Sequence, residues 1–326
     1  MNGLDDPIRL IPVHQVEVAV SILAETEDYN HQLMNIPAIW KRTKGAGVKL
    51  AVLDTGLPNH MDIKPSGGKS FVQGYLEDKN GHATHCGGII AATAYNDMGI
   101  RGIAPDVEDY YGAVMGADGS GTVNQIIAGI RWAVDDIGAD IISMSLGISA
   151  YAPYIPELEA ACKYAVDRGV AIFAASGNEG GNVGQPARYD CVYAIAAIDE
   201  RMDLASFSNR GKEIDFAAGG VQVFSTYLRN TYARLNGTSM ACPAIAAVGA
   251  LILADAKAGQ NPRKLTPTEL GAKIQKIAYD LGPAGTDMFY GAGIPIFSAW
   301  SDVTGTPPPL PPKKSWWKRW LGLCRG

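Results

Sequence analysis

Cysteine is scarce in this 326-residue chain, which has five cysteines at widely separated positions. No Cys-x-x-Cys pair and no cysteine–histidine cluster suggests zinc, and an odd, scattered set does not make a disulfide framework. The opening stretch, MNGLDDPIRLIP, has two acids and no apolar core of about 7–15 residues, so it is not a secretory signal. We therefore expect a cytoplasmic protein with reduced thiols.

A surplus of basic charge is also missing. Lys and Arg number 28 against 33 Asp and Glu, a formal net charge of −5, which argues against nucleic acid as a partner. Residues 307–326 differ from the rest, because they hold five basic side chains and no acid: Lys313, Lys314, Lys318, Arg319 and Arg325. An acidic body thus carries a basic tail.

Apolar runs of membrane-spanning length are absent as well. The stretch from Ala241 to Ala256 is nearly all small or apolar, but it is short and suits a core helix. Shorter β-branched runs alternate with helical patterns along the chain, and this rhythm predicts one α/β domain with a mostly parallel central sheet and helices on both faces. The runs lie at 47–54, 108–115, 139–147, 169–176 and 192–198, and the helical patterns at 123–138 and 156–169.

Four polar residues stand at the ends of these elements. They are Asp54 in VLDTG, His82 in GHATHCGG, Asn178 in AASGNEGG and Ser239 in NGTSMACP. A serine hydroxyl attacks when a neutral imidazole takes its proton, and a buried carboxylate holds that imidazole in the right tautomer. An amide and a helix-start N–H can stabilise the resulting oxyanion. Each residue also has an ordinary interpretation as a cap or turn residue, but their joint occurrence favours catalysis.

These motifs, in the order Asp, His, Asn, Ser, resemble those of the subtilisin family of serine proteases over about residues 36–300. The resemblance implies a subtilisin-like three-layer sandwich that hydrolyses peptide bonds. It also implies that Asp54 orients His82, which serves Ser239 as general base and then acid, and that Asn178 donates to the oxyanion. The chain departs from the usual motifs at Ala83, Gly219 and Ala244, and none of these changes removes a catalytic group.

Cys86 lies one helical turn after His82. A thiol at this position resembles the thiol-bearing branch of the family. We expect it to be an inert packing residue, because a free thiol in apolar surroundings behaves as a small hydrophobe. A mercurial that reaches it should nevertheless disturb His82, and a Cys86→Ser variant should be less sensitive to mercury.

The resemblance also marks a substrate cleft. Two segments resemble the strands that flank an extended peptide, and main-chain pairing with them tolerates many sequences. Gly184 matches the floor of the pocket for the residue before the scissile bond, which implies room for a large apolar side chain. The two flanking segments are Gly119, Ser120, Gly121 and Ser145, Leu146, Gly147.

The stretch AYNDMGIRGIAP resembles the tight calcium loop of the family, which implies Ca²⁺ as a bound cofactor. Oxygen ligands are what this hard cation prefers. A plain turn around Asn96 and Asp97 is the alternative. The implied ligands are two side chains and three backbone carbonyls, namely Asp62 and Asn96 with Ala94, Met98 and Ile100.

An N-terminal extension, residues 1–35, precedes the expected peptidase domain at 36–303. Its RLIPVHQ segment resembles the LIPY-type motif of intracellular subtilisins. The resemblance implies an inhibitory segment lying in the substrate groove, where Pro12 denies the geometry that cleavage needs. An edge strand of the sheet is the alternative. We expect a zymogen that stays latent until the extension is cut.

The C-terminal end divides into a proline-rich linker, 304–314, and a basic aromatic tail, 315–326. Proline-rich linkers are stiff. On a helix, the tryptophans and leucines of the tail would face opposite its Lys and Arg residues, which suits a membrane surface or an acidic partner. An unstructured tail is the alternative.

The sequence thus predicts an intracellular serine endopeptidase that acts on peptide or protein substrates. Two rivals remain: a regulatory homologue that holds peptides without cleaving them, and a selective processing protease for one partner. An oligomer is left open.

Overall fold

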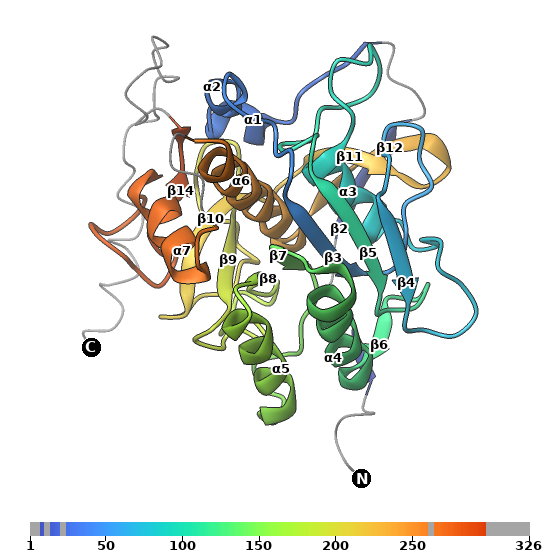
Figure 1. Cartoon of the computed structure of the whole chain (residues 1–326). Helices are drawn as coiled ribbons and strands as arrows, with labels where there is room; N and C mark the ends of the chain where they lie inside the picture. The colour runs from blue at the N-terminus through green and yellow to red at the C-terminus, as the bar shows by residue number, and fades with distance from the viewer. Residues whose placement is uncertain (1–6, 10–13, 20–23, 260–263, 298–326) are drawn as a thin grey trace.

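The computed structural model describes residues 7–9, 14–19, 24–259 and 264–297. A central sheet runs through the molecule, with helices in front of it and behind it (Figure 1). The sheet has seven strands in the order β10-β9-β8-β7-β3-β5-β4, and every neighbouring pair is parallel. The predicted α/β fold with a mostly parallel sheet is therefore confirmed.

The strands of this sheet are short and largely buried. Every residue of β7 and β8 is buried, as expected for strands that are covered on both faces. The strand bounds are β3 Lys49–Asp54, β4 Gly67–Ser70, β5 Glu108–Ala113, β7 Ile141–Met144, β8 Ala171–Ala175, β9 Tyr193–Ile198 and β10 Ile214–Gly219.

Helices cover both faces of the sheet. One face carries α3 and α6, which pack against each other, and the other carries α4 and α5 (Figure 1). A capping box at Thr122 starts α4, which continues into a π-helical turn at Ala133–Ile137. The helix bounds are α1 Tyr29–Leu33, α2 Ile36–Trp40, α3 His82–Ala91, α4 Val123–Trp132, α5 Pro156–Asp167, α6 Thr238–Ala258 and α7 Pro267–Lys276.

The core helix α6 is longer than the sequence pattern indicated. It has 21 residues, from Thr238 to Ala258, and so extends beyond the apolar run at both ends. By length and composition it could cross a membrane, but 89% of its most apolar window is buried inside the protein. Pro243, the sixth residue of the helix, cannot bond to the Ser239 carbonyl one turn before it; that carbonyl accepts instead from the Ser145 hydroxyl at 2.8 Å and the Cys86 thiol at 3.4 Å.

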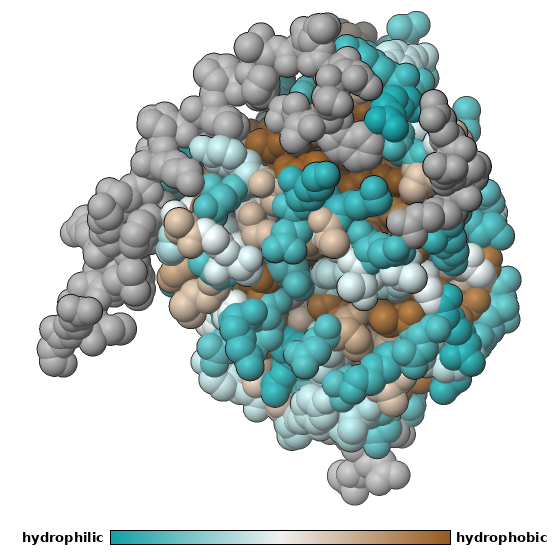
Figure 2. Space-filling view, turned by 60° about the vertical axis from the view of Figure 1, so that its left-hand side comes forward, coloured by the Kyte–Doolittle hydropathy of each residue, from teal (hydrophilic) through white to brown (hydrophobic). Residues whose placement is uncertain are grey.

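The outer surface is consistent with this burial. Polar residues cover most of the face in Figure 2, and apolar residues show between them in smaller patches. Among the described residues the exposed large apolar side chains are Met61, Tyr95, Met98, Tyr151, Tyr154 and Met288.

The described parts of the N-terminal extension add strands to two small sheets. β1 (Pro7–Arg9) pairs antiparallel with β6 (Ser120–Thr122). β2 (His14–Ala19) pairs antiparallel with β12 (Thr231–Asn236), which also pairs with β11 (Val223–Tyr227). A further two-stranded sheet joins β13 (Ala278–Tyr279) to β14 (Ile294–Pro295). The extension is therefore not an edge strand of the seven-stranded sheet in the residues described.

The carboxyl ends of the central strands lie at one edge of the sheet because the strands are parallel. Asp54 ends β3, Ser145 follows β7, and Asn178 comes shortly after β8. Ligand and catalytic sites of open parallel sheets lie at this edge.

Candidate active site

Asp54 and His82 form a buried polar pair at this edge. Nδ1 of His82 lies 2.8 Å from Oδ1 of Asp54 and 2.9 Å from Oδ2. The side chains are 0% and 3% exposed, respectively. A carboxylate at Nδ1 keeps the neutral imidazole protonated there, which leaves Nε2 as the basic nitrogen.

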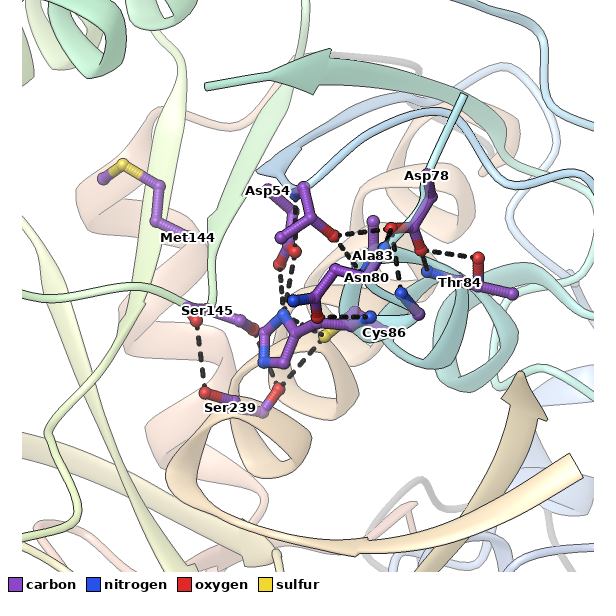
Figure 3. Close-up of polar contacts among 12 residues, drawn as sticks. Asp54, Asp78, Asn80, Ala83, Thr84, Cys86, Met144, Ser145 and Ser239 are labelled. Atoms are coloured by element: carbon purple, nitrogen blue, oxygen red, sulfur yellow. Dashed lines mark hydrogen bonds and ion pairs between the residues drawn. The ribbon is translucent and has the colours of Figure 1, made fainter. Parts of the chain in front are cut away.

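A second buried carboxylate, Asp78, holds the start of α3 in position (Figure 3). Its Oδ1 accepts from the backbone N–H groups of the two residues before His82, at 2.9 and 3.0 Å. Its Oδ2 accepts from the backbone N–H and the hydroxyl of Thr84, at 2.8 and 2.7 Å. Thr55, which follows Asp54, donates its hydroxyl to Asp78 at 2.9 Å. Asp78 thereby ties the end of β3 to the residues around His82.

Ser239 is the second residue of α6 and bonds to the segment after β7. Its Oγ donates to the Ser145 carbonyl oxygen at 3.1 Å, and Ser145 Oγ donates to the Ser239 carbonyl at 2.8 Å. Asp54, Cys86 and Ser239 face one another from β3, α3 and α6 (Figure 3). Within the described residues, Nε2 of His82 is buried without a hydrogen-bond partner.

Asn178 is oriented by the residue before Ser239. Its Oδ1 accepts from the backbone N–H and from the hydroxyl of Thr238, both at 2.8 Å. The amide oxygen is thus engaged on one side, and Nδ2 is the donor on the other. The Ser239 N–H lies in the first turn of α6, where N–H groups have no intrahelical acceptor and the helix dipole is positive. Such a pair of donors can stabilise an oxyanion.

The electrostatics of the pair favour a charged imidazole. Burial alone lowers the pKa of His82, but the Asp54 carboxylate and Cys86 outweigh this and raise the pKa well above its ordinary value. A serine that attacks must pass its proton to His82, so a site that stabilises the resulting imidazolium favours that step.

One of the two predicted substrate segments is paired with the N-terminal extension in the structure. Gly119 precedes β6, which contains Ser120 and Gly121 and pairs with β1. On the other side, the Leu146 side chain is fully buried, and Gly147 follows it. At Gly184 an added Cβ would lie 2.4 Å from the Ile148 carbonyl oxygen, so only glycine fits there without rearrangement.

The candidate calcium loop wraps around the Asp62 side chain. Asp62 Oδ1 accepts from the Asn96 amide at 2.7 Å, and Oδ2 accepts from the Ile100 N–H at 2.9 Å. An added Cβ at Gly99 would lie 2.1 Å from Oδ2, which shows how closely the loop surrounds the carboxylate. Burial raises the pKa of Asp62, and the nearby Glu25 charge adds to the shift. This oxygen-rich set fits a hard divalent cation.

Glu25, which the sequence did not indicate, also contacts this loop. Its Oε1 accepts from the Asn96 N–H at 3.1 Å, and it forms an ion pair with Arg101. Thr26 also joins this loop, through an N–H bond of 2.9 Å to the Gly99 carbonyl. The loop motif could not identify Glu25, because this acid lies far from it in the sequence. The loop carbonyls of Ala94 and Met98 belong to the same segment.

The sequence also did not indicate two residues that orient the predicted catalytic side chains. Asp78 holds the backbone just before His82, and Thr238 holds the amide of Asn178. A weak signal for Asp78 existed, since an aspartate just before a helix start often caps its N–H groups.

The chain matches a known protein family and several proteases by sequence. The model of the subtilase family matches residues 45–293. The chain is 41% identical over 263 residues to Subtilisin DY of Bacillus licheniformis, covering 77% of this chain and 89% of that protein. It is 44% identical over 236 residues to Subtilisin Savinase of Lederbergia lenta, covering 70% and 86%. It is 37% identical over 278 residues to the minor extracellular protease Epr of Bacillus subtilis (strain 168), covering 84% and 41%.

Proposed function

Because the chain belongs to the subtilase family and is a serine endopeptidase of that family, we propose that Asp54, His82 and Ser239 are its catalytic triad and Asn178 its oxyanion donor. The observation that carries this assignment is the buried bond between Asp54 and His82 Nδ1 at 2.8 Å. It lies beside a serine at the start of a buried helix.

The steps follow from the positions of these groups. His82 Nε2 takes the hydroxyl proton as Ser239 Oγ attacks the scissile carbonyl carbon, and Asp54 stabilises the imidazolium that forms. The Asn178 amide and the Ser239 N–H bind the oxyanion. His82 then gives its proton to the leaving amine, and water hydrolyses the acyl-enzyme by the same route.

A fluorophosphonate probe tests the assignment. Intact mass should show one adduct on the wild-type protein after its N-terminus has been trimmed, and none on Ser239→Ala. A trimmed, folded wild type without an adduct would support the rival function, a homologue that binds peptides without cleaving them.

We also propose that the N-terminal extension keeps the enzyme latent. Its β1 pairs with β6, with Ile8 opposite Gly121, which is where the substrate strand is expected. Its β2 begins with His14 opposite Asn236, three positions before Ser239. One described part thus pairs with the proposed substrate segment, and the other pairs with the strand that leads into α6 and Ser239. Pro12 and the rest of residues 10–13 lie outside the described residues, so the role of the LIPY-like motif stays a prediction.

Bound Ca²⁺ is a third part of the proposal. Asp62, Asn96 and Glu25 would hold the ion by their side chains, together with the loop carbonyls of 94, 98 and 100. The ion would tie this loop to Glu25 in the later part of the N-terminal extension.

The remaining predictions concern location, partners and selectivity. The names of the three relatives do not describe intracellular proteins, and one of them is an extracellular protease by name, so the cytoplasmic location stays our proposal. The linker 304–314 and the tail 315–326 lie outside the described residues, and docking of the tail on a membrane surface or acidic partner stays a prediction. A selective processing role is the second candidate, since Gly184 and the cleft strands do not define one substrate.

A further inference from the structure

The strand β12 carries the chain into the proposed catalytic serine, and the extension lies along it in one direction. β12 ends at Asn236 and is followed directly by α6, whose second residue is Ser239. β2 runs antiparallel to β12, from His14 opposite Asn236 toward Ala19, so it leads away from the serine. A substrate bound in the same direction would place the residues after its scissile bond along β12.

One edge of β12 is suited to binding an extended peptide. β11 pairs with one edge of this strand, and β2 pairs with the other. Main-chain N–H and C=O groups along such an edge bind an extended segment with little regard to its side chains. Any selectivity along this edge therefore has to come from the side chains of β12 and of its neighbour β11.

Arg234 is the one charged residue of β12, whose sequence is TYARLN. The carbon of its guanidinium lies 4.9 Å from the ring centroid of Phe224 on β11, and its Nη1 donates to the Gln222 carbonyl at 3.1 Å. These two contacts hold the side chain in a defined position. A guanidinium has five N–H donors, so the bond to Gln222 leaves others for a carboxylate.

The acid nearby, Asp28, is already engaged by other donors. Burial raises its pKa, and the charge of Arg234 is among the influences that oppose this shift. Its Oδ1 accepts from the backbone N–H and from the side-chain amide of Asn30, both at 3.0 Å, and its Oδ2 accepts from the Phe224 N–H at 3.0 Å. Arg234 can therefore meet a further carboxylate brought by a peptide on β12.

The extension has an acid at the matching position of the register. Glu17 is opposite Arg234, and it is the one acid in the segment HQVEVA. The register shifts between Arg234 and Leu235, which leaves Val16 as an extra residue of β2. This bulge puts Glu17 rather than Val16 opposite Arg234. Opposite charges at facing positions stabilise an antiparallel strand pair.

We propose that the edge of β12 binds the substrate segment that follows the scissile bond, and that Arg234 gives this site a preference for an acidic side chain. The substrate class is then peptides and proteins with Asp or Glu a few residues after the cut. The inference rests on the proposed function, because it takes Ser239 as the point from which the segment leads away. Arg234 binds the leaving segment and takes no part in the chemical steps.

Internally quenched peptides test the preference on trimmed, active enzyme. In an otherwise uncharged sequence, one Glu is moved through the second to the sixth position after the scissile bond, and mass spectrometry confirms where the peptide is cut. We expect one position at which Glu raises kcat/KM about three- to fivefold over Gln and Lys lowers it by a similar factor, as for an exposed ion pair. About 0.5 M salt should reduce both effects.

Ratios of kcat/KM remain valid if part of β2 stays attached to the trimmed chain. Such a segment competes equally with every peptide of the series, so it lowers all the rates by the same factor and leaves the ratios unchanged.

Variants assign the preference to Arg234. Arg234→Gln should abolish the preference for Glu, and Arg234→Glu should reverse it in favour of Lys. Lys276→Glu makes the same change of charge on an exposed residue of α7 and should keep the wild-type preference. Circular dichroism and the melting temperature identify a variant that fails to fold.

The outcomes separate this inference from the proposed function. If trimmed wild type cuts none of the peptides, the proposed function fails and this inference fails with it. If it cuts them with equal kcat/KM for Glu, Gln and Lys at all positions, the proposed function stands and the inference is overturned. A preference for Glu that persists in a folded Arg234→Gln protein would overturn it as well.

Discussion

Asp54 does two things for His82: it sets the tautomer of the imidazole, and it stabilises the charged form. Both effects come from a buried carboxylate whose oxygens lie 2.8 and 2.9 Å from Nδ1. Burial opposes protonation of His82, yet the pKa is raised well above its ordinary value because the Asp54 charge and Cys86 prevail. The basic form of His82 therefore accumulates only as pH rises through this raised pKa.

Asp54→Asn should separate these effects. We expect kcat/KM to fall about 10⁴-fold at neutral pH, because the wrong tautomer is favoured. The ascending limb of its pH profile should move to lower pH, since the negative charge that raised the His82 pKa is gone. Profiles of kcat/KM against pH test this, with Asp136→Asn as an exposed control. An unshifted limb in a folded variant would contradict the assigned pair.

The buried carboxyl of Asp109 on β5 makes the stability of the fold depend on pH, which can be tested without any assay of catalysis. Burial raises its pKa to about 6, from 3.8, although the Tyr111 hydroxyl donates to it at 2.7 Å. Between these two values the folded state holds a proton that the unfolded state has lost, so stability falls as pH rises.

The Asp109→Asn variant keeps an acceptor for Tyr111 and cannot ionise. Relative to this variant, the wild type should lose up to about 3 kcal/mol of unfolding free energy between pH 4 and pH 7. Denaturant titrations of both proteins in the Ser239→Ala background measure the difference. A difference that does not vary with pH would show that Asp109 is not a buried acid.

At the scale of elements, the active site depends on contacts between a strand end and a helix start. Asp78 connects Thr55 after β3 to the first turn of α3, and Ser145 connects β7 to α6. Thr122 is the last residue of β6, and its side chain caps α4. The proposed substrate strand β6 is therefore fixed at one end by a helix. These contacts therefore fix the proposed catalytic groups to strand ends and helix starts.

The pairing of β1 with β6 should control how quickly the enzyme activates. Ile8→Pro removes a backbone N–H from β1 and so weakens its strand pairing. We expect the purified full-length variant to trim its N-terminus at least several-fold faster than the wild type, as followed by intact mass over time.

The trimmed product supplies the control for this prediction. If the cut removes residue 8, wild type and variant yield the same chain, and their final activities should be equal. Equal trimming rates, or full activity of the untrimmed wild type toward a small peptide substrate, would contradict the latency proposal.

At the scale of the whole molecule, one loop joins segments from distant parts of the chain. Asp62 follows β3, Asn96 follows α3, and Glu25 belongs to the segment that precedes α1. Tyr232 of β12, the strand that pairs with β2, donates its hydroxyl to Asp62 at 3.3 Å. A cation held there would stabilise the fold and would also support the strand on which the extension lies.

Calcium should therefore raise the melting temperature of the Ser239→Ala protein. Free Ca²⁺ at about 100 times its dissociation constant contributes about 2.7 kcal/mol. Asp62→Asn should lose most of this gain, while Asp136→Asn, an exposed acid elsewhere, should keep it. Thermal melts with calcium and with chelator measure both. An equal calcium response in a folded Asp62→Asn protein would exclude this loop as the site.

The sequence by itself determined the fold class and singled out four polar residues as the proposed catalytic groups. Apolar runs with strand and helix periods predicted the parallel sheet, because local periodicity reports which residues face the core. Asp54, His82, Asn178 and Ser239 stood out because each is polar at the end of a buried element. The core helix was recognised, although its bounds at Thr238–Ala258 extend past the apolar run.

Only the tertiary structure decided which of these residues touch and what else joins them. Asp54 and His82 are 28 positions apart, and the support from Asp78, the position of Glu25 and the strand pairs of the extension all depend on long-range packing. The same holds for the contact of the Cys86 thiol with the Ser239 carbonyl at 3.4 Å, because these residues are 153 positions apart and only the packing of α3 against α6 brings them together.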